Sequence, residues 1–250
     1  MGIKRSWTDK YYIGAYDTNT RGEIKLSRLT GYIQETAWHH ASHLGLGADF
    51  IYKENMVWML AAIKIHIDYY PRWMDNIKIT SWPRGIDRFF YLRDFVMVDN
   101  KGNRFGIAST QWLLLDIKSK RPKIFTNETI LKVIENQKSV FDENIKKLPV
   151  IENGSDIIKS VDYTDMDLNH HLNSNRYIDL IIGSFDYKFV KENKITDLQL
   201  NYLKEVKEVP NIIISKYNIH DSLMFLLEGF SSDHKIKHFQ SFTSFEPNIS

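Results

Sequence analysis

Cysteine is absent from the 250-residue sequence. This absence excludes disulfide bonds, cysteine-ligated metal sites and a cysteine nucleophile. Long hydrophobic runs are also missing, because the longest, Met56–Ile63, is far too short to cross a bilayer as a helix. The first ten residues, MGIKRSWTDK, lack the apolar segment of a secretory signal. The sequence therefore predicts a cytoplasmic protein with no membrane span.

An excess of charge of one sign is missing as well. Lys and Arg number 33 and Asp and Glu 31, which gives a net charge of +2. A concentrated basic face is expected of proteins that bind nucleic acid, so we expect no such partner. An acidic protein partner remains compatible with this charge. Aromatic residues, by contrast, make up 13% of the chain, which favours β-structure or a large apolar pocket over a helical bundle.

The first half of the chain predicts one long helix followed by an antiparallel meander. Apolar residues recur every three or four positions from Leu26 to Leu44, as on a helix with one apolar face. Ser27 is placed to cap the start of this helix, and Gly45 to adopt the left-handed conformation after its end. Strand-like segments follow at 64–70, 76–83, 89–99 and 104–117, with a hairpin turn at Asp99–Asn103.

The second half repeats this plan. A helix is expected from about Asn173, with Tyr177, Ile181, Phe185 and Phe189 on one face. Strand-like segments follow at 195–206, 209–220, 222–232 and 235–245. The segment Lys120–Ser155 between the halves is charged, contains two prolines and has only a weak helical pattern, which is typical of a linker with one or two short helices. We therefore expect an α+β protein with domains at 1–135 and 159–250, joined by a linker at 136–158.

The two halves can be aligned as an internal repeat. Placing Tyr177 of YID on Tyr32 of YIQ sets an offset of 145 positions, from 32 to 177. In this alignment Asp167, Asn169 and His171 correspond to Gly22, Ile24 and Leu26. These three residues of the first half have no carboxylate, amide or imidazole side chain. This alignment predicts that the first half serves as a scaffold and that the second half carries the chemistry.

The stretch VDYTDMDLNHHLNSNRYIDLI, Val161–Ile181, gathers Asp, Asn and His side chains just before the second helix. In an extended segment Asp167, Asn169 and His171 would point to one side, because they occupy alternate positions. A helix start offers unpaired N–H groups and the positive end of the helix dipole, which suit a developing oxyanion. A carboxylate could activate water or attack there, while imidazole and amide orient the carbonyl. A purely structural interpretation is also open, since Asp and Asn are common in turns and caps.

This stretch resembles the signature of the acyl-acyl carrier protein thioesterases, approximately D-x-D-x-N-x-H-x-N-x-x-Y. Other segments are similar to the same family, in the same order: YIQETAWHHASHLGLG, YYPRWMDNIKITSWPRG, FFYLRDF and QWLLLDIKSKRP. The resemblance spans about Tyr12 to Phe245. It implies a double (tandem) hot dog fold, in which each half is an antiparallel sheet wrapped around a long central helix. It also implies hydrolysis of fatty acyl-acyl carrier protein thioesters to free fatty acid.

The resemblance further implies catalytic roles for Asp167, Asn169 and His171, and for an acid in a downstream Y-x-x-E-C pattern. That pattern reads YLKEV here, so the acid falls on Glu205. The sequence departs from the family at Val206, where many members have the cysteine that an older proposal made the nucleophile. Chemistry without cysteine requires carboxylates, an amide and an imidazole, and we expect no cofactor and no metal.

We interpret Asp167 as the attacking carboxylate or as the base that activates water. Glu205 would help to position or activate the water, and His171 and Asn169 would hold the site and the thioester oxygen. The sequence leaves covalent attack and direct hydrolysis open. The acyl chain is expected in an apolar tunnel of the first half, with large side chains of Met56–Ile63 in its lining.

The implied partner is an acyl carrier protein that carries a fatty acyl chain. The basic clusters Lys118–Lys123 and Lys146–Lys147 are interpreted either as solvated surface or as its docking face, and docking of this kind weakens with salt. Monomer and homodimer are both compatible, because two hot dog halves in one chain already supply the contact that single-domain relatives gain by dimerising.

Three alternative functions stay open. The same fold could hydrolyse acyl-coenzyme A, which assays of both carriers with matched chains would separate. The chain could be a non-catalytic acyl-thioester-binding protein, against which the intact set Asp167, Asn169, His171 and Glu205 argues. A dehydratase on a hot dog scaffold is the third alternative, and the full-length resemblance argues against it.

A possible metal cluster is formed by Glu35, His39 and His43, which lie at four-residue steps on one helix face. In the zinc motif H-E-x-x-H a Glu follows the first His, but here His40 stands there. We therefore expect an outer helix face and no bound metal.

Two neighbouring pairs complete the candidates. Arg93 and Asp94 are interpreted as a structural ion pair, with contact to the substrate as the alternative. Of the adjacent His170 and His171, the resemblance selects His171, and His170 is expected to face solvent or a neighbouring loop.

Overall fold

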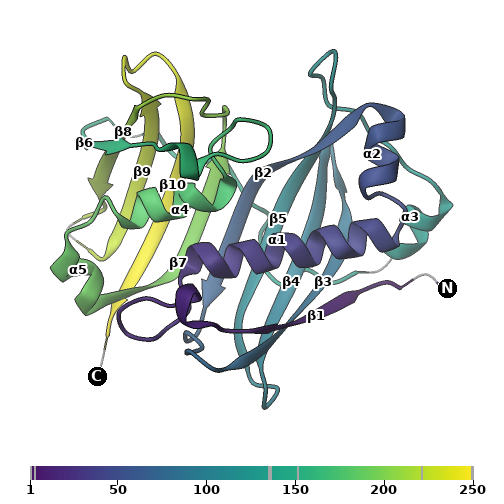
Figure 1. Cartoon of the computed structure of the whole chain (residues 1–250), viewed down its shortest axis with the longest axis horizontal. Helices are drawn as coiled ribbons and strands as arrows, with labels where there is room; N and C mark the ends of the chain where they lie inside the picture. Colours follow the sequence, from purple (N-terminus) through teal and green to yellow (C-terminus); the bar gives the residue numbers. More distant parts are fainter. Residues whose placement is uncertain (1, 3, 135–136, 151, 221, 249–250) are drawn as a thin grey trace. The chain divides into compact units, whose positions relative to one another are not determined.

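In the computed structural model, the chain forms two compact units, Met1–Ile145 and Lys146–Ser250. The structure describes residues 2, 4–134, 137–150, 152–220 and 222–248. The division falls within the segment 136–158 that the sequence assigns to a linker. Within the described residues each unit contains helices and a five-stranded antiparallel sheet, so the expected α+β class is confirmed (Figure 1).

The sheet of the first unit has the strand order β1-β3-β4-β5-β2, and each neighbouring pair is antiparallel. Its members are β1 (Trp7–Tyr12), β2 (Met56–Ile67), β3 (Asn76–Asp87), β4 (Phe90–Asp99) and β5 (Arg104–Asp116). Three of the four predicted strands are confirmed, whereas the one predicted at 64–70 is part of the longer β2, which begins at Met56 and ends at Ile67. Gly102 in the β4–β5 turn has a φ of 87°, as expected there. Sequence analysis misses β1, because the strand has only six residues and three of them are polar.

Helix α1 (Leu26–His43) lies across the strands of this sheet (Figure 1). The ring of Tyr32 stacks on Tyr11 of β1, with centroids 4.3 Å apart. Gly45 has a φ of 77°, which confirms the predicted left-handed residue. The predicted cap is wrong: Lys25 is the N-cap residue, and Ser27 is buried inside the first turn. The apolar face buries Leu26, Leu29, Ile33 and Ala37. The unit also contains η1 (Ala15–Asp17), α2 (Ala48–Glu54) and α3 (Glu128–Ile134).

The sheet of the second unit has the strand order β7-β10-β9-β8-β6, again with antiparallel neighbours. Its members are β6 (Ser155–Ser160), β7 (Asn193–Tyr202), β8 (Asn211–Asn218), β9 (Met224–Ser231) and β10 (Lys237–Pro247). The four predicted strands are confirmed, whereas β6 lies in the segment read as linker. Asp221, between the strands predicted at 209–220 and 222–232, is outside the described residues.

The second unit does not contain one long helix through Phe189, so that prediction is wrong. Instead α4 (Ser174–Ile182) is followed by a separate α5 (Tyr187–Glu192), and η2 (Tyr163–Asp165) precedes both. The predicted start is confirmed, because the Asn173 side chain caps α4 by accepting a hydrogen bond from the Asn175 N–H at 3.0 Å.

Two lysines explain where α4 ends. Lys159 of β6 donates to the carbonyl of Gly183, and Lys216 of β8 donates to the carbonyl of Ser184 at 2.9 Å. The last carbonyls of a helix lack partners within the helix, and cations near them also interact favourably with the dipole. The apolar periodicity that suggests a single helix is real but spans the break, because Phe185 and Phe189 stack on each other at 5.2 Å.

Among the residues that the structure describes, no helix is both long enough and apolar enough to cross a membrane.

Candidate active site

The candidate site lies in the second unit, in the loop between η2 and α4. The loop closes through an antiparallel bridge between Met166 and Leu172. Below the bridge, the buried carboxylate of Asp165 accepts hydrogen bonds from the N–H of Asp162 at 3.0 Å and from Nε of Arg176 at 2.7 Å. These bonds hold both ends of the loop, so the five residues between Met166 and Leu172 are fixed at their base.

Asp167 organises a tight turn at the top of this loop. Its Oδ1 accepts hydrogen bonds from the N–H groups of Asn169 at 2.7 Å and His171 at 3.1 Å. His170 has a φ of 59°, which turns the chain back on itself. The segment is not extended, so the predicted shared face of residues 167, 169 and 171 is wrong. The reason is that a short carboxylate side chain competes for nearby backbone N–H groups and stabilises a turn instead.

The structure brings His171 and Glu205 into contact, with Nε2 and Oε2 3.2 Å apart. Their side chains are 25% and 47% exposed, so the pair is accessible to solvent. Glu205 follows β7, and its segment is fastened to the loop because the Leu172 N–H donates to the Val206 carbonyl at 2.8 Å. The side chain of Asn169 is exposed and makes no hydrogen bond with any described residue.

Tyr177 of α4 is a site residue that sequence analysis treats only as part of the apolar face. Its hydroxyl accepts a hydrogen bond from the Val206 N–H at 3.3 Å. Burial, together with the negative charges of Glu205 and Asp167, raises the pKa of Tyr177 to about 12. The sequence signal that could have identified Tyr177 as a site residue is the Tyr at the end of the family motif.

His238 of β10 is a second residue that the sequence does not single out. Its buried ring places Nδ1 3.1 Å from the carbonyl oxygen of Lys204, and burial lowers its pKa. A neutral ring must then carry its proton on Nδ1 to donate to that carbonyl. The N–H groups of Leu203 and Lys204 donate back to the His238 carbonyl at 2.8 and 3.1 Å. His238 thus positions the segment that bears Glu205.

The first unit contains the same loop at an offset of 148 positions, so the predicted offset of 145 is wrong for this segment. A bridge between Thr18 and Ile24 matches the one between Met166 and Leu172. Gly22 has a φ of 72° where His170 has 59°. The 145 alignment rests on an apolar helical dipeptide, which recurs in amphipathic helices, whereas the 148 alignment rests on the backbone of the loop.

The equivalent loop has the same turn but different chemistry. Asn19 stands in the place of Asp167, and its Oδ1 accepts hydrogen bonds from the N–H groups of Arg21 at 2.8 Å and Glu23 at 3.2 Å. Nε of Arg21 also pairs with Oε2 of Glu23 at 2.6 Å. The expectation that this loop is free of polar groups is therefore wrong. The loop nevertheless lacks an imidazole, and its charges pair with each other.

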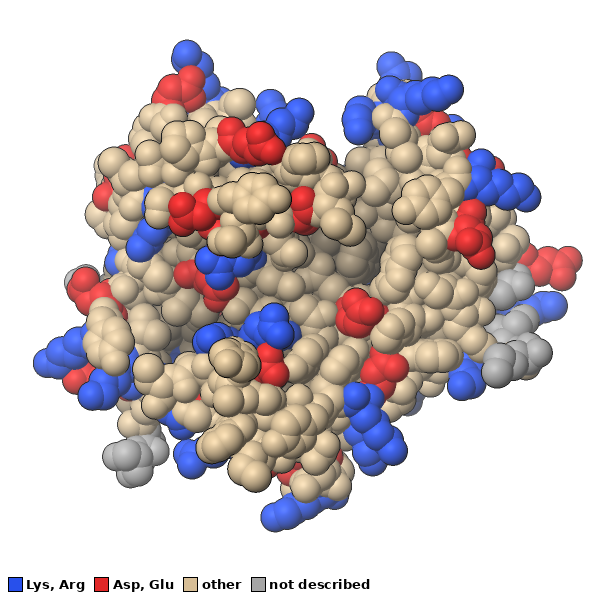
Figure 2. Space-filling model, in the orientation of Figure 1, with Lys and Arg blue, Asp and Glu red and all other residues tan. Residues whose placement is uncertain are grey.

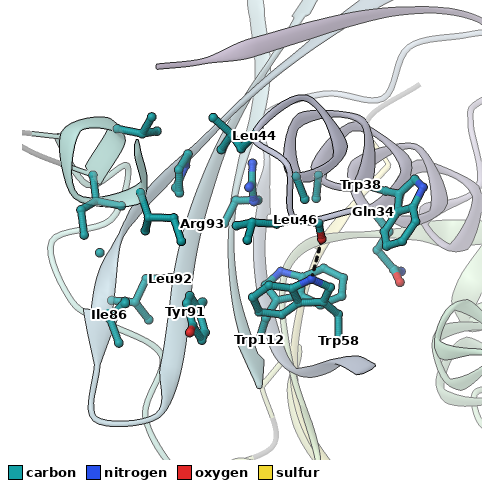
Figure 3. Close-up of a pocket in the computed structure, with 17 residues that line it drawn as sticks. Gln34, Trp38, Leu44, Leu46, Trp58, Ile86, Tyr91, Leu92, Arg93 and Trp112 are labelled. Carbon is teal, nitrogen blue, oxygen red and sulfur yellow. Dashed lines mark hydrogen bonds between the residues drawn. The ribbon is translucent and has the colours of Figure 1, made fainter. Parts of the chain in front are cut away.

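The first unit also contains an apolar pocket, lined by α1, α3 and the sheet (Figure 3). It holds about 710 Å³ of space, with the solvent-open mouth included. Three tryptophans line it, Trp38, Trp58 and Trp112. Of the predicted lining run Met56–Ile63, Trp58 contributes, and its indole N–H donates to the Leu46 carbonyl at 3.1 Å.

Arg93 and Asp94 do not pair with each other, so the predicted ion pair is wrong. As neighbours on a strand they point to opposite faces of the sheet. Asp94 pairs with Nε of Arg84 at 3.1 Å. Arg93 is 9% exposed, lines the pocket, and donates from Nη1 to Nδ1 of His40 and Oγ of Ser81, both at 3.0 Å.

His40 connects Arg93 to the N-terminal segment. Because Nδ1 accepts from Arg93, Nε2 carries the proton and donates to the Lys4 carbonyl at 3.0 Å. Burial, reinforced by the Arg93 charge, lowers the pKa of His40 to about 4.

We expect the stability of the protein to fall as the pH decreases from about 6.5 to 4. Unfolded His40 binds a proton near its ordinary pKa, whereas folded His40 stays neutral to about pH 4, so the unfolded state binds more protons in this window. The loss due to His40 approaches roughly 3 kcal/mol at the lower end. Urea denaturation at pH 7 and pH 4.5 would measure it. His40→Gln should lose clearly less stability than the wild type between these pH values, and an equal loss would contradict the prediction.

The other candidate clusters have ordinary partners. His39 bridges two carboxylates, with Nδ1 2.8 Å from Asp9 and Nε2 3.2 Å from Glu35. The ring of His43 lies 5.1 Å from that of Trp7. His170 is exposed, as expected, and lies 3.1 Å from Glu208. Figure 2 shows basic and acidic side chains interspersed over the face in view.

Comparison with known proteins identifies two family models in the chain. The acyl-ACP thioesterase N-terminal domain matches residues 4–133, and the acyl-ACP thioesterase C-terminal domain matches residues 151–244. A chloroplastic acyl-[acyl-carrier-protein] hydrolase of Cuphea viscosissima is 24% identical over 210 residues, which cover 78% of this chain and 51% of the relative. A chloroplastic oleoyl-acyl carrier protein thioesterase of Arabidopsis thaliana is 22% identical over 240 residues, covering 84% and 65%. The chain thus spans about half to two thirds of the length of these relatives.

Solved structures share the fold over nearly the whole chain. An acyl-ACP thioesterase from Bacteroides thetaiotaomicron superimposes with a TM-score of 0.88 at 20% identity, covering 97% of this chain and 98% of that one. The 12:0-ACP thioesterase from Umbellularia californica gives a TM-score of 0.85 at 18% identity, with 99% and 100% covered. The expected double hot dog fold is therefore confirmed.

Proposed function

Because the chain belongs to the acyl-ACP thioesterase family, we propose that it hydrolyses fatty acyl thioesters of acyl carrier protein and releases free fatty acid. The observation that carries the proposal is the contact of 3.2 Å between His171 and Glu205, beside the turn that Asp167 organises. The relatives named above are thioester hydrolases by name. The first unit lacks an imidazole in the equivalent loop, so the second unit is the place for the reaction.

In the proposed reaction a water oxygen ends on the carbonyl carbon, the C–S bond breaks, and the sulfur leaves as thiolate or takes a proton. Oδ1 of Asp167 is held by the turn, whereas Oδ2 makes no hydrogen bond with any described residue and is available to attack or to accept a proton from water. Glu205 orients the His171 ring and helps to position the water. The exposed Asn169 amide is placed to donate to the thioester oxygen.

The function is tested by incubating the protein with acyl carrier protein thioesters of graded chain length and identifying the released acids by mass spectrometry. Coenzyme A thioesters with the same chains serve as the comparison. Faster hydrolysis of the coenzyme A series would favour the acyl-CoA alternative. Binding of the thioesters without release of any acid would favour the non-catalytic alternative.

A docking role for the basic clusters Lys118–Lys123 and Lys146–Lys147 predicts weaker activity on the carrier protein at high salt.

We further propose that the apolar pocket of the first unit receives the acyl chain. Ala41 of α1 lines this pocket. We expect Ala41→Leu to shift the released acids toward shorter chains, because the larger side chain takes space from the pocket. The nearly isosteric Ala41→Ser is the matched control and should keep the wild-type profile. An unchanged profile for Ala41→Leu, in a protein that melts normally, would contradict this role.

The oligomeric state, monomer or homodimer, and the cytoplasmic location stay predictions from the sequence.

A further inference from the structure

The wall of the apolar pocket carries a single charged group. Among the residues that line it, Arg93 alone is ionised at neutral pH. Most other polar atoms of the wall are turned to protein partners: the Tyr91 hydroxyl donates to the Phe125 carbonyl at 2.9 Å, and the indole N–H of Trp112 donates to Oγ1 of Thr110 at 2.8 Å. A cation in such a wall is costly unless an anion or several acceptors compensate for lost water.

Arg93 uses only two of its five side-chain N–H donors in hydrogen bonds with described residues. Both of its side-chain bonds come from Nη1, to His40 and to Ser81, at 3.0 Å each. Within the described residues Nε and Nη2 have no hydrogen-bond partner, and no carboxylate pairs with this guanidinium. Asp94, its neighbour in sequence, forms an ion pair with Arg84 instead, with Oδ2 and Nε 3.1 Å apart. The side chain is nevertheless more than nine-tenths buried, at 9% exposure.

The unused atoms are the pair that recognises a carboxylate. Nε and Nη2 lie on one edge of the planar guanidinium, and their parallel N–H bonds match the two oxygens of a carboxylate. The bonds to His40 and Ser81 hold the group in place before any ligand arrives, so little side-chain freedom remains to be lost on binding.

We propose that this pocket binds an alkyl carboxylate, with the carboxylate on the Nε/Nη2 edge of Arg93 and the alkyl chain along the tryptophan-lined wall (Figure 3). Two sources supply this chemistry. One is free fatty acid, the product of the proposed reaction, which would then inhibit the enzyme. The other is an acyl substrate whose far end carries a second carboxylate. The choice between the sources rests on the proposed function, whereas binding itself does not.

The first test compares two probes of equal length, dodecanoate and dodecanol. Trp38, Trp58 and Trp112 line the pocket, so intrinsic tryptophan fluorescence reports binding without turnover. We expect the wild type to bind dodecanoate about 10- to 100-fold more tightly than dodecanol, as charge-assisted hydrogen bonds predict. Equal affinities in the wild type would overturn the proposal, and this comparison needs no variant.

Variants then assign the preference to Arg93. Arg93→Met should abolish the preference for dodecanoate, and Arg93→Lys, which keeps the charge but loses the planar edge, should reduce it. Lys101→Met removes an exposed positive charge from the β4–β5 turn and should keep the wild-type preference. A preference that survives in Arg93→Met, or that is lost equally in Lys101→Met, would overturn the proposal. Thermal melting of each variant confirms that it is folded.

The second test separates the sources. Inhibition of thioester hydrolysis by dodecanoate that is relieved in Arg93→Met identifies the product. A preference for ω-carboxyacyl over plain acyl thioesters of equal length, lost in Arg93→Met, identifies the substrate end. Arg93-dependent binding without hydrolysis of any thioester would overturn the proposed function and leave this inference standing. Hydrolysis without Arg93-dependent binding would overturn this inference alone.

Discussion

Asp167→Asn is expected to lower kcat for thioester hydrolysis by about 10²- to 10⁴-fold while leaving the fold intact. An amide cannot act as nucleophile or base, but its oxygen can still accept the two backbone hydrogen bonds that hold the turn. The first unit shows that this replacement is tolerated, because Asn19 accepts the same two bonds at 2.8 and 3.2 Å. Steady-state hydrolysis of an acyl carrier protein thioester and a thermal melt together measure both parts of the prediction.

The same variant decides between the two interpretations of Asp167. If the residue only stabilises the turn, Asp167→Asn retains activity and Asp167→Ala loses both activity and stability. If the carboxylate reacts, Asp167→Asn and Asp167→Ala are both inactive, and Asp167→Asn melts close to the wild type. Full activity in Asp167→Asn would remove this residue from the proposed mechanism.

Glu205→Gln is expected to lower kcat by about 10²-fold with a smaller change in KM. The neutral amide removes the negative charge that faces Nε2 of His171 at 3.2 Å, so the ring loses the charged group that orients it. Steady-state kinetics of purified Glu205→Gln would measure kcat and KM.

The chain offers a matched control for this variant. Glu208 pairs with the adjacent His170 at 3.1 Å, nearly the same distance, but both side chains are exposed, at 70% and 82%. Glu208→Gln should therefore leave kcat and KM within about twofold of the wild type, as expected for a surface substitution. Equal losses in Glu205→Gln and Glu208→Gln would show that general surface charge, and not the His171–Glu205 contact, supports activity.

Much of the fold is predictable because its signals are local. Eight strands and the start of α4 follow from alternation, from apolar runs and from the cap residue Asn173. The break after Ile182 is not predictable in the same way, because it depends on lysines from β6 and β8 that reach the helix end only in the folded protein. Strands β1 and β6 were missed because each has only six residues, of which at least half are polar.

The candidate site likewise has features that the sequence predicts and features that depend on the folded protein. The resemblance selects His171 and Glu205, which the structure places in contact although 34 positions separate them. The turn around Asp167 is not predicted by alternation, which suggests an extended segment. The turn forms because the Asp167 carboxylate accepts hydrogen bonds from backbone N–H groups two and four positions ahead. Tyr177 and His238 support Glu205 through backbone bonds to Val206 and Lys204, which no sequence spacing reveals.

The paired loops, at an offset of 148 positions, have the same backbone but different polar side chains. Both have the same bridge, the same left-handed residue and the same oxygen-centred turn, although one holds Asn19, Arg21 and Glu23 and the other Asp167, Asn169 and His171. One loop backbone thus accepts two different sets of polar side chains. The loop of the first unit could therefore receive the Asp, Asn and His set of the second unit by substitution at positions 19, 21 and 23, without a change of its backbone.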